Sequence, residues 1–304
     1  MQVIKHLLKP CLVLSLFLSM FVSEDIWAGS GLTGVFVSSK IRPYLEALEG
    51  FKNTSDRELL VLYLDENPEL ARHYLLKGEL DAAVAIGPEA AKLIYSTKSP
   101  VAVRMVIMTL DIKKLLPNID PCGIDLRLPI SYQITRIAYR LGRNRSLAII
   151  FNPEENSDIT AAARLACKKN GLSFIPLPVT GTDEIMKKLR PEIKNIDILL
   201  FIPDSTVISE KIVTHLIKEA IFNGIAAVGY NHFFYETGAL MAFTIDYKKT
   251  GADGARLLEE ISKGRCRLLP PPVTEEWNSK VIKILRSKRP DRWKEIPGGA
   301  ADDK

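Results

Sequence analysis

The stretch LLFIPDSTVISEKI, residues 199–212, indicates the fold class, because it joins a strand that must be buried to an amphipathic helix. Residues 199–202 form an apolar run that predicts a core strand, and a proline ends that strand. Asp204, Ser205 and Thr206 follow at once, so three hydrogen-bonding side chains stand at its carboxyl end. They either start the next helix or face a ligand, and the rest of the chain has to decide.

Apolar strands and amphipathic helices alternate on both sides of this stretch. The strands are apolar nearly throughout, which is typical of parallel strands covered by helices on both faces. The expected strands are 35–37, 59–64, 82–86 and 101–108, then 147–151, 172–175, 196–202, 225–228 and 240–245, with a last extended piece at 271–274. The expected helices are 43–52, 68–77, 88–96, 158–169, 183–193, one that follows Thr206, and 250–263.

The repeated pattern predicts an α/β protein with two doubly wound parallel-sheet lobes. Residues 29–126 and about 246–269 are expected to form lobe 1, and residues 127–245 and about 270–285 to form lobe 2. The chain would then cross between the lobes more than once, through a hinge of several crossovers. Residues 286–304 are polar and are expected to form a surface arm or to be disordered.

The first residues have the pattern of a secretion signal. Lys5, His6 and Lys9 precede an apolar run from Cys11 to Val22, which is too short to span a bilayer comfortably. Ala28 offers a small residue at a plausible cleavage point. We therefore expect residues 1–28 to be a cleaved signal peptide and the protein to be periplasmic or otherwise extracytoplasmic; an uncleaved anchor is the alternative.

Composition and motifs exclude several classes of function. The net charge of +5 is modest and the basic residues are scattered, so we expect no nucleic-acid surface. Gly29 to Gly34 spell GxGxxG but precede a strand, whereas the dinucleotide motif follows one. Cys122, Cys167 and Cys266 lack metal-ligand spacing, and a bridge between Cys122 and Cys266 stays open. We predict no catalytic residues, no metal and no cofactor.

Polar residues or helix starts follow almost every predicted strand, at the end where doubly wound sheets bind ligands. Each alone is more often a helix cap or turn former, but so many on two facing lobes predict a ligand cleft. The candidate ligand contacts are Ser38, Ser39, Gly87, Pro88, Glu89 and Thr109 in the first half, and Asn152, Asp204, Ser205, Thr206, Tyr230 and Asn231 in the second.

Such a cleft favours a small polar ligand with an anionic group, because helix N-termini stabilise negative charge. Asp204 has the opposite preference and suits an ammonium group, so the two together fit a zwitterion such as an amino acid. The aromatic segment 230–235 either stacks on the ligand or fills the lobe core or a partner interface.

Several segments resemble the solute-binding proteins of bacterial ABC transporters, in the branch that includes binders of tryptophan and other aromatic amino acids. The resemblance covers about residues 122–285 and rests on LAIIFNPE (147–154), IPDSTV (202–207), TGAL (237–240), IDY (245–247) and EWNSKV (276–281). In the first half, AIGPEAA (85–91) is similar to the family's glycine-led helix start, although Pro88 stands where serine or threonine is usual.

This resemblance implies a type I periplasmic-binding fold, with crossovers near Leu126–Pro129, Thr244–Asp246 and Leu269–Pro271, and with a ligand clamped between the lobes by hinge closure. It further implies that a membrane permease recognises the closed form. We predict a monomeric, non-enzymatic, exported binding protein that captures an amino acid or related carboxylate for an ABC importer. A receptor subunit that feeds a signalling partner is the alternative.

Overall fold

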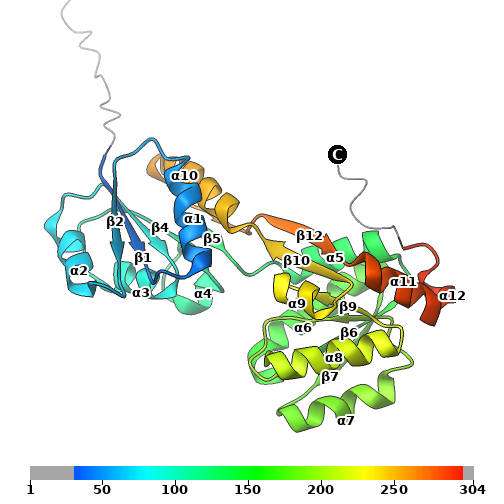
Figure 1. Ribbon diagram of the computed structural model, residues 1–304. Helices are drawn as coiled ribbons and strands as arrows, with labels where there is room; N and C mark the ends of the chain where they lie inside the picture. The colour runs from blue at the N-terminus through cyan, green and yellow to red at the C-terminus, as the bar shows by residue number, and fades with distance from the viewer. Residues whose placement is uncertain (1–30, 297–304) are drawn as a thin grey trace, which may run out of the picture.

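The computed structural model describes residues 31–296, which fold into two lobes that lie side by side (Figure 1). The expected signal peptide, residues 1–28, lies outside the described residues, as do residues 297–304. Each lobe is built on one six-stranded sheet with helices on both faces. Across residues 31–296, every helix is too short or too polar to cross a membrane.

The sheet of lobe 1 is parallel in every pairing, with strand order β11-β5-β4-β3-β1-β2. Apolar side chains are buried on both of its faces, Val35 and Val37 on one and Phe36 on the other. Its strands are β1 Thr33–Val37, β2 Leu59–Tyr63, β3 Ala82–Ile86, β4 Val103–Thr109, β5 Gly123–Asp125 and β11 Leu268–Leu269. Its helices are α1 Arg42–Lys52, α2 Pro68–Lys77, α3 Pro88–Ser96, α4 Ile112–Leu115 and α10 Tyr247–Ser262.

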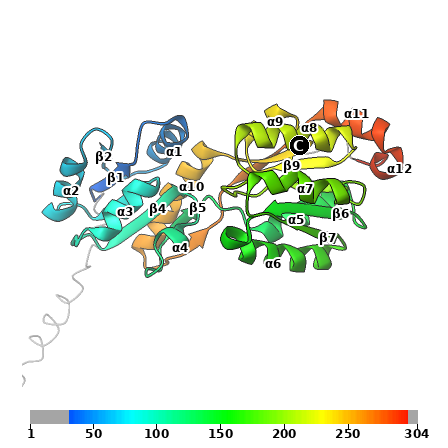
Figure 2. The ribbon, with the colours of Figure 1, turned by 90° about the horizontal axis from the view of Figure 1, so that it is seen from below.

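Helix α10 returns from late in the sequence to lie beside α1 (Figures 1 and 2). Two glycines allow this close approach. A Cβ atom on Gly50 would lie 1.8 Å from the Lys248 carbonyl oxygen, and one on Gly251 would lie 1.8 Å from the Ala47 carbonyl oxygen. Because real Cβ contacts are never so short, any side chain at either position would push the helices apart.

The sheet of lobe 2 has strand order β12-β10-β9-β8-β6-β7 and is parallel except for β12, which pairs antiparallel with β10. Its strands are β6 Ser146–Phe151, β7 Ser173–Pro178, β8 Ile198–Leu200, β9 Ala226–Gly229, β10 Met241–Ile245 and β12 Val273–Trp277. Its helices are α5 Ile130–Leu141, α6 Pro153–Asn170, α7 Thr182–Glu192, α8 Glu210–Phe222, α9 His232–Thr237, α11 Ser279–Lys288 and α12 Pro290–Trp293.

The chain passes between the lobes three times, from β5 to α5, from β10 to α10 and from β11 to β12. The predicted fold class, two doubly wound α/β lobes, is confirmed. A disulfide joins Cys122 to Cys266, with a Cα–Cα distance of 5.2 Å, and so links the starts of β5 and β11. Cys167 is free and buried, and this burial raises the pKa of its thiol to about 11.

Two local predictions were wrong for identifiable reasons. The helix expected to follow Thr206 starts at Glu210, because the Ser209 side chain caps it by accepting a hydrogen bond from the Ile212 amide. Residues 205–207 form a turn instead. The helix expected at 158–169 starts at Pro153, where the Asn152 side chain accepts from the Glu154 amide.

The first part of the polar C-terminal segment, residues 286–296, is folded onto lobe 2 and does not form a loose arm. It finishes α11 and forms α12, and Trp293 is fully buried against lobe 2. The Trp293 indole N–H donates to the Gly224 carbonyl oxygen at 2.7 Å, and the Arg145 guanidinium lies 4.4 Å from its ring centroid. Buried Asp197 pairs with Arg289 at 3.1 Å. The expectation of a surface arm is therefore wrong for residues 286–296.

Candidate functional site

A cavity of about 490 Å³ lies beside the hinge, between lobe 2 and the crossovers. Most of its wall is apolar: Leu110, Leu126, Leu128, Pro129, Ile130, Ile159, Ala162, Ile202, Pro203, Ile208, Phe243, Ile245 and Val273. Its polar lining residues are Arg127, Ser131, Gln133, Asp158, Tyr230, Asn231 and Tyr247. The volume is in the range of small-molecule sites, which are mostly apolar with a few polar groups that orient the ligand.

Unsatisfied polar atoms gather at this cavity. In the described part of the chain, six buried side-chain nitrogen or oxygen atoms lack a hydrogen-bond partner, and four belong to residues that line it. The four atoms are Arg127 Nε, Gln133 Oε1, the Tyr230 hydroxyl oxygen and Asn231 Oδ1. An unpaired buried polar atom costs about 1–3 kcal/mol, so these four atoms retain hydrogen-bonding capacity at the cavity that water or a ligand can use.

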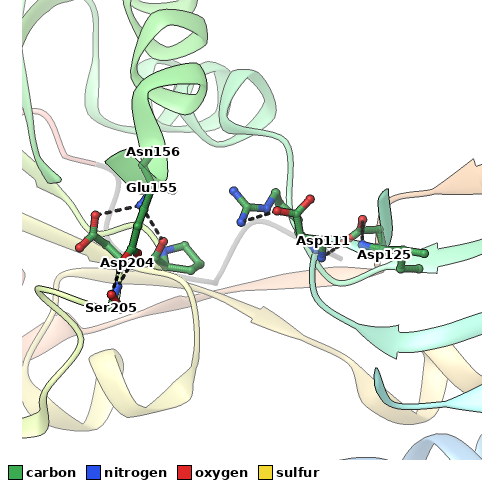
Figure 3. Close-up of polar contacts among 9 residues, drawn as sticks. Asp111, Asp125, Glu155, Asn156, Asp204 and Ser205 are labelled. Carbon is green, nitrogen blue, oxygen red and sulfur yellow. Dashed lines mark hydrogen bonds and ion pairs between the residues drawn. The ribbon is translucent and has the colours of Figure 1, made fainter. Parts of the chain in front are cut away.

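At the first crossover, the Asp125 carboxylate holds the backbone that carries Arg127. Figure 3 shows Asp125 beside Asp111. The Asp125 carboxylate accepts hydrogen bonds from the backbone N–H groups of Asp111 at 2.8 Å, Ile112 at 2.9 Å and Arg127 at 2.8 Å. Arg127 Nη2 lies 3.0 Å from Asp111 Oδ2. Asp111 has φ 59°, in the left-handed region that aspartate tolerates better than most residues. The guanidinium therefore has a fixed position, with Nε still unpaired.

Gln133 belongs to helix α5 and is 4% exposed. Its Nε2 donates to the Leu128 carbonyl oxygen at 3.1 Å, which fixes the orientation of the amide and leaves Oε1 as an unpaired acceptor. Asn231 is the N-terminal residue before α9, but its side chain makes no capping hydrogen bond. Both amide oxygens are thus acceptors without donors.

Tyr230 and Asp158 are further polar residues of the lining, beside Ser131 and Tyr247. Burial, with a smaller effect from the Asp204 charge, raises the pKa of Tyr230 to about 12, so its phenol stays neutral and can donate. Asp158 follows a kink in α6 at Asn156, whose φ is −132°. Asp158 is an exposed residue of the lining.

The Asp204 carboxylate is engaged within lobe 2, as Figure 3 shows in part. Its Oδ2 accepts from the Asn152 backbone N–H at 2.7 Å and from Asn156 Nδ2 at 2.8 Å, and its Oδ1 accepts from the Thr206 backbone N–H at 3.0 Å. The side chain is 2% exposed. Asp204 thereby ties the end of β8 to the end of β6.

Neighbouring predicted contacts also bond within lobe 2. Asn152 Nδ2 donates to Thr206 Oγ1 at 3.1 Å. Both the backbone N–H and the hydroxyl of Ser205 donate to the Glu155 carboxylate, which lowers the pKa of Glu155. Asn152, Ser205 and Thr206 thus surround the Asp204 side chain and lie outside the cavity lining.

The predicted contacts of lobe 1 meet at the carboxyl edge of its sheet. Ser38 Oγ accepts from the Ala90 backbone N–H at 3.0 Å and so caps α3. Gly87 has φ 97°, and a Cβ there would lie 2.6 Å from Ser38 Oγ, so only glycine fits. Thr109 is 1% exposed. Ser39 follows Ser38 and is half-buried, Pro88 opens α3, and Glu89 pairs with Lys92 at the surface.

Residues 71–280 match the family model described as ABC transporter substrate binding protein, which is more than half of the chain. The chain belongs to this family. A substrate-binding protein of ABC transport delivers a solute and catalyses no reaction, which agrees with the predicted lack of enzymatic activity. No curated protein matches the sequence.

Solved structures show the fold of this substrate-binding protein. It is similar to the ligand-free, open structure of a substrate-binding protein with adhesive properties from Clostridium difficile, at 16% identity over 84% of this chain and 94% of that one, with TM-score 0.68. It is also similar to an ABC domain in complex with L-Trp from Streptococcus pneumonia, at 14% identity, the same two coverages and TM-score 0.52. A conserved domain protein from Vibrio cholerae matches at 15% identity and TM-score 0.53, with the same coverages.

Two of the twelve predicted contacts, Tyr230 and Asn231, line the cavity of this substrate-binding protein. Within the aromatic segment, Phe234 is 2% exposed and fills the core, as one of the two alternatives expected. Tyr230 packs on it, with ring centroids 4.7 Å apart, and lines the cavity. Sequence reasoning missed Arg127 and Gln133. A signal existed for each: Arg127 lies in the expected first crossover, and Gln133 interrupts an apolar helix face.

Proposed function

We propose that this substrate-binding protein captures a small ligand with a carboxylate and an apolar body, an amino acid or a related carboxylate, in the hinge cavity. The observation that carries the proposal is the cluster of four unsatisfied buried polar atoms in an otherwise apolar wall. The apolar wall suits an apolar ligand body, because burial of that surface supplies the non-directional part of affinity.

Arg127 is the proposed carboxylate-binding residue. A guanidinium binds a carboxylate through charge-assisted hydrogen bonds, and this one has an unpaired Nε at the cavity wall. Its backbone and its Nη2 are already held by Asp125 and Asp111, so little side-chain entropy is lost when a ligand binds. Tyr230 supplies a second donor.

The position of the cavity links ligand binding to movement of the lobes. Leu110 and Tyr247 come from lobe 1, whereas Ile159 and Phe243 come from lobe 2, so one ligand contacts both. A ligand that contacts both lobes stabilises a closed form over an open one by its difference in affinity. Closure would bring the carboxyl edge of lobe 1, with Ser38, Gly87 and Thr109, towards the ligand. The ABC permease would then receive the closed form.

The disulfide supports a place outside the cytoplasm, since such bonds persist in oxidising compartments. We accordingly place the protein, after removal of residues 1–28, in the periplasm or an equivalent extracytoplasmic space. We place it there as a monomer.

A thermal-shift screen of purified residues 29–304 tests the proposal. Ligand that co-purifies is first identified by mass spectrometry of denatured protein, and ligand-free protein is then screened with amino acids, plain carboxylates and sugars. A ligand at 100 times its dissociation constant stabilises the folded state by about 2.7 kcal/mol, a shift of several degrees. We expect shifts with carboxylates that have an apolar body. Shifts with sugars alone, or with none of the compounds, would contradict the proposal.

A single substitution tests whether the carboxylate of the ligand binds at Arg127. Arg127→Met should weaken carboxylate binding at least about tenfold in isothermal titration calorimetry, because the charge-assisted hydrogen bond is lost. Arg42→Met is the matched control, since Arg42 lies on α1 with its side chain 90% exposed and pairs with Glu46. Unchanged affinity in Arg127→Met would show that the carboxylate binds elsewhere.

A further inference from the structure

The basic residues are scattered through most of the chain but gather in its last two helices. Residues 279–296, which form α11 and α12, carry seven Lys or Arg residues and two Asp or Glu residues, a net charge of +5. The whole chain also has a net charge of +5, so its remaining residues are balanced. Both helices lie at the end of lobe 2 that faces away from lobe 1 (Figures 1 and 2). The excess positive charge is therefore concentrated at one end of the molecule.

The inner arginines of this segment are neutralised by nearby carboxylates. Arg289 Nη2 lies 3.1 Å from Asp197 Oδ1. Arg292 Nε lies 3.5 Å from the same oxygen and 3.7 Å from Asp291 Oδ2. The outer basic side chains are exposed and define a surface that we call the basic end of lobe 2: Lys280, Lys283, Arg286, Lys288 and Lys294. Glu295 is exposed next to Lys294, so basic groups outnumber acidic ones on this surface.

Two exposed apolar side chains lie at the same end. Phe222 is the last residue of α8 and is 69% exposed, and Ile284 on α11 is 39% exposed. Lys288 Nζ lies 4.8 Å from the centroid of the Phe222 ring, so this ring is part of the basic end. Lys280, Ile284 and Lys288 are four residues apart along α11 and share one face of it. Basic and exposed apolar side chains thus lie next to one another.

This combination matches the surface of an anionic lipid bilayer. Lipid phosphates attract lysine and arginine, while exposed aromatic and aliphatic side chains enter the boundary between headgroups and acyl chains. An acidic polypeptide would match the charges of the basic end equally well. Its carboxylates would offer Phe222 and Ile284 no apolar environment. The apolar side chains therefore favour a lipid surface as the partner.

We propose that the basic end of lobe 2 binds the surface of an anionic phospholipid membrane, with Phe222 and Ile284 at the headgroup boundary. The contact is peripheral, because Val281, Ile282 and Leu285 on the other face of α11 are buried in lobe 2. None of the residues of the basic end lines the hinge cavity. The inference goes beyond the proposed ligand and does not depend on it, since lobe 2 alone makes the contact, whether the lobes are open or closed.

Co-sedimentation with lipid vesicles tests the proposal. Residues 29–304 are used, because the apolar run from Cys11 to Val22 would itself bind lipid. Vesicles of phosphatidylcholine with about 30% phosphatidylglycerol are compared with vesicles of phosphatidylcholine alone, at about 100 mM NaCl. We expect affinity for the anionic vesicles to be at least about tenfold higher than for the neutral ones, and to fall at least about tenfold at about 500 mM NaCl.

Paired substitutions test which residues make the contact. The double variant Lys283→Glu with Lys288→Glu should bind anionic vesicles at least about 100-fold more weakly, because each change replaces an attraction by a repulsion. Lys52→Glu with Lys98→Glu is the matched control, since it changes the net charge equally at exposed positions of lobe 1 and should alter binding less than about threefold.

A second pair tests the apolar contribution. Phe222→Ser should weaken binding to anionic vesicles about 5- to 10-fold, because the ring no longer enters the headgroup boundary. Leu76→Ser is its control, as Leu76 is 52% exposed on α2 of lobe 1 and should leave binding unchanged. All substituted side chains are exposed, and circular dichroism checks that each variant is folded.

Three results would overturn the proposal. The first is an absence of binding to anionic vesicles at about 100 mM NaCl. The second is equal weakening by the two lysine double variants, which would show that net charge alone decides binding. The third is binding to poly-L-glutamate without binding to vesicles, which would assign the basic end to an acidic polypeptide instead.

Discussion

Replacement of Asp204 by alanine separates a structural aspartate from a ligand contact. Its carboxylate is 2% exposed and accepts from the Asn152 backbone N–H, Asn156 Nδ2 and the Thr206 backbone N–H at 2.7–3.0 Å. Asn156 is itself 2% exposed, so its side-chain amide cannot rotate to form a hydrogen bond with solvent when the carboxylate is gone. The variant would leave buried donors without an acceptor between β6 and β8.

The expected cost follows from these donors. The Asn152 N–H would lose its acceptor, and the Asn156 amide would keep only its 3.3 Å hydrogen bond to the Pro203 carbonyl oxygen; at about 1–3 kcal/mol per lost partner, the free energy of unfolding should fall by about 2–6 kcal/mol. Urea unfolding, followed by circular dichroism, measures this loss. Asp183→Ala is the control, because Asp183 pairs with Lys187 at the surface, where an ion pair adds little to stability, and the unfolding transition should change far less.

Binding is measured on the same variant without urea, at a temperature at which the variant remains folded. The structure predicts ligand affinity within about threefold of wild type, a change of less than about 0.7 kcal/mol. A variant as stable as wild type that no longer binds ligand would refute this reasoning and restore Asp204 as the ligand contact that the sequence suggested.

Three other measurements follow from the fold. Replacement of Cys122 and Cys266 by serine should lower the stability of lobe 1 by ~5 kcal/mol, from loop entropy across 144 residues, in calorimetry against oxidised wild type; an unchanged transition would contradict this. Trp293→Ala should cost about 3–5 kcal/mol in urea unfolding, since it empties a buried site and frees the Gly224 carbonyl. Cys167, with its pKa raised to about 11 by burial, should resist a thiol reagent until the protein is denatured, and rapid native labelling would show that lobe 2 opens.

The fold could be predicted because its signals are local. Each parallel strand is a short apolar run, and residues such as Val35 and Phe36 show burial on both faces directly, without knowledge of their neighbours. The C-terminal segment was misread because its overall composition is polar. Two apolar residues in it, Trp293 and Ile296, were the available signal, and both are buried.

The site could be predicted only in part because its signals are not local. The structure places Asn156, 48 residues earlier in the chain, against the Asp204 carboxylate, and no local pattern around Asp204 indicates this partner. The Asp125 carboxylate likewise has non-local partners, because it accepts from the backbone N–H groups of Asp111 and Ile112 in the loop after β4. Tyr230 and Asn231 were found because they follow a strand that ends at the cavity, whereas Gln133 lies inside a helix, where the strand-end rule does not apply.

A crystal structure of the protein grown with the compound that gives the largest thermal shift tests the central claim most directly. The account predicts that the ligand lies in the hinge cavity, with its carboxylate on Arg127 and the lobes closed around it. A ligand bound instead at Asp204, Ser205 and Thr206, with the hinge cavity empty, would contradict the account.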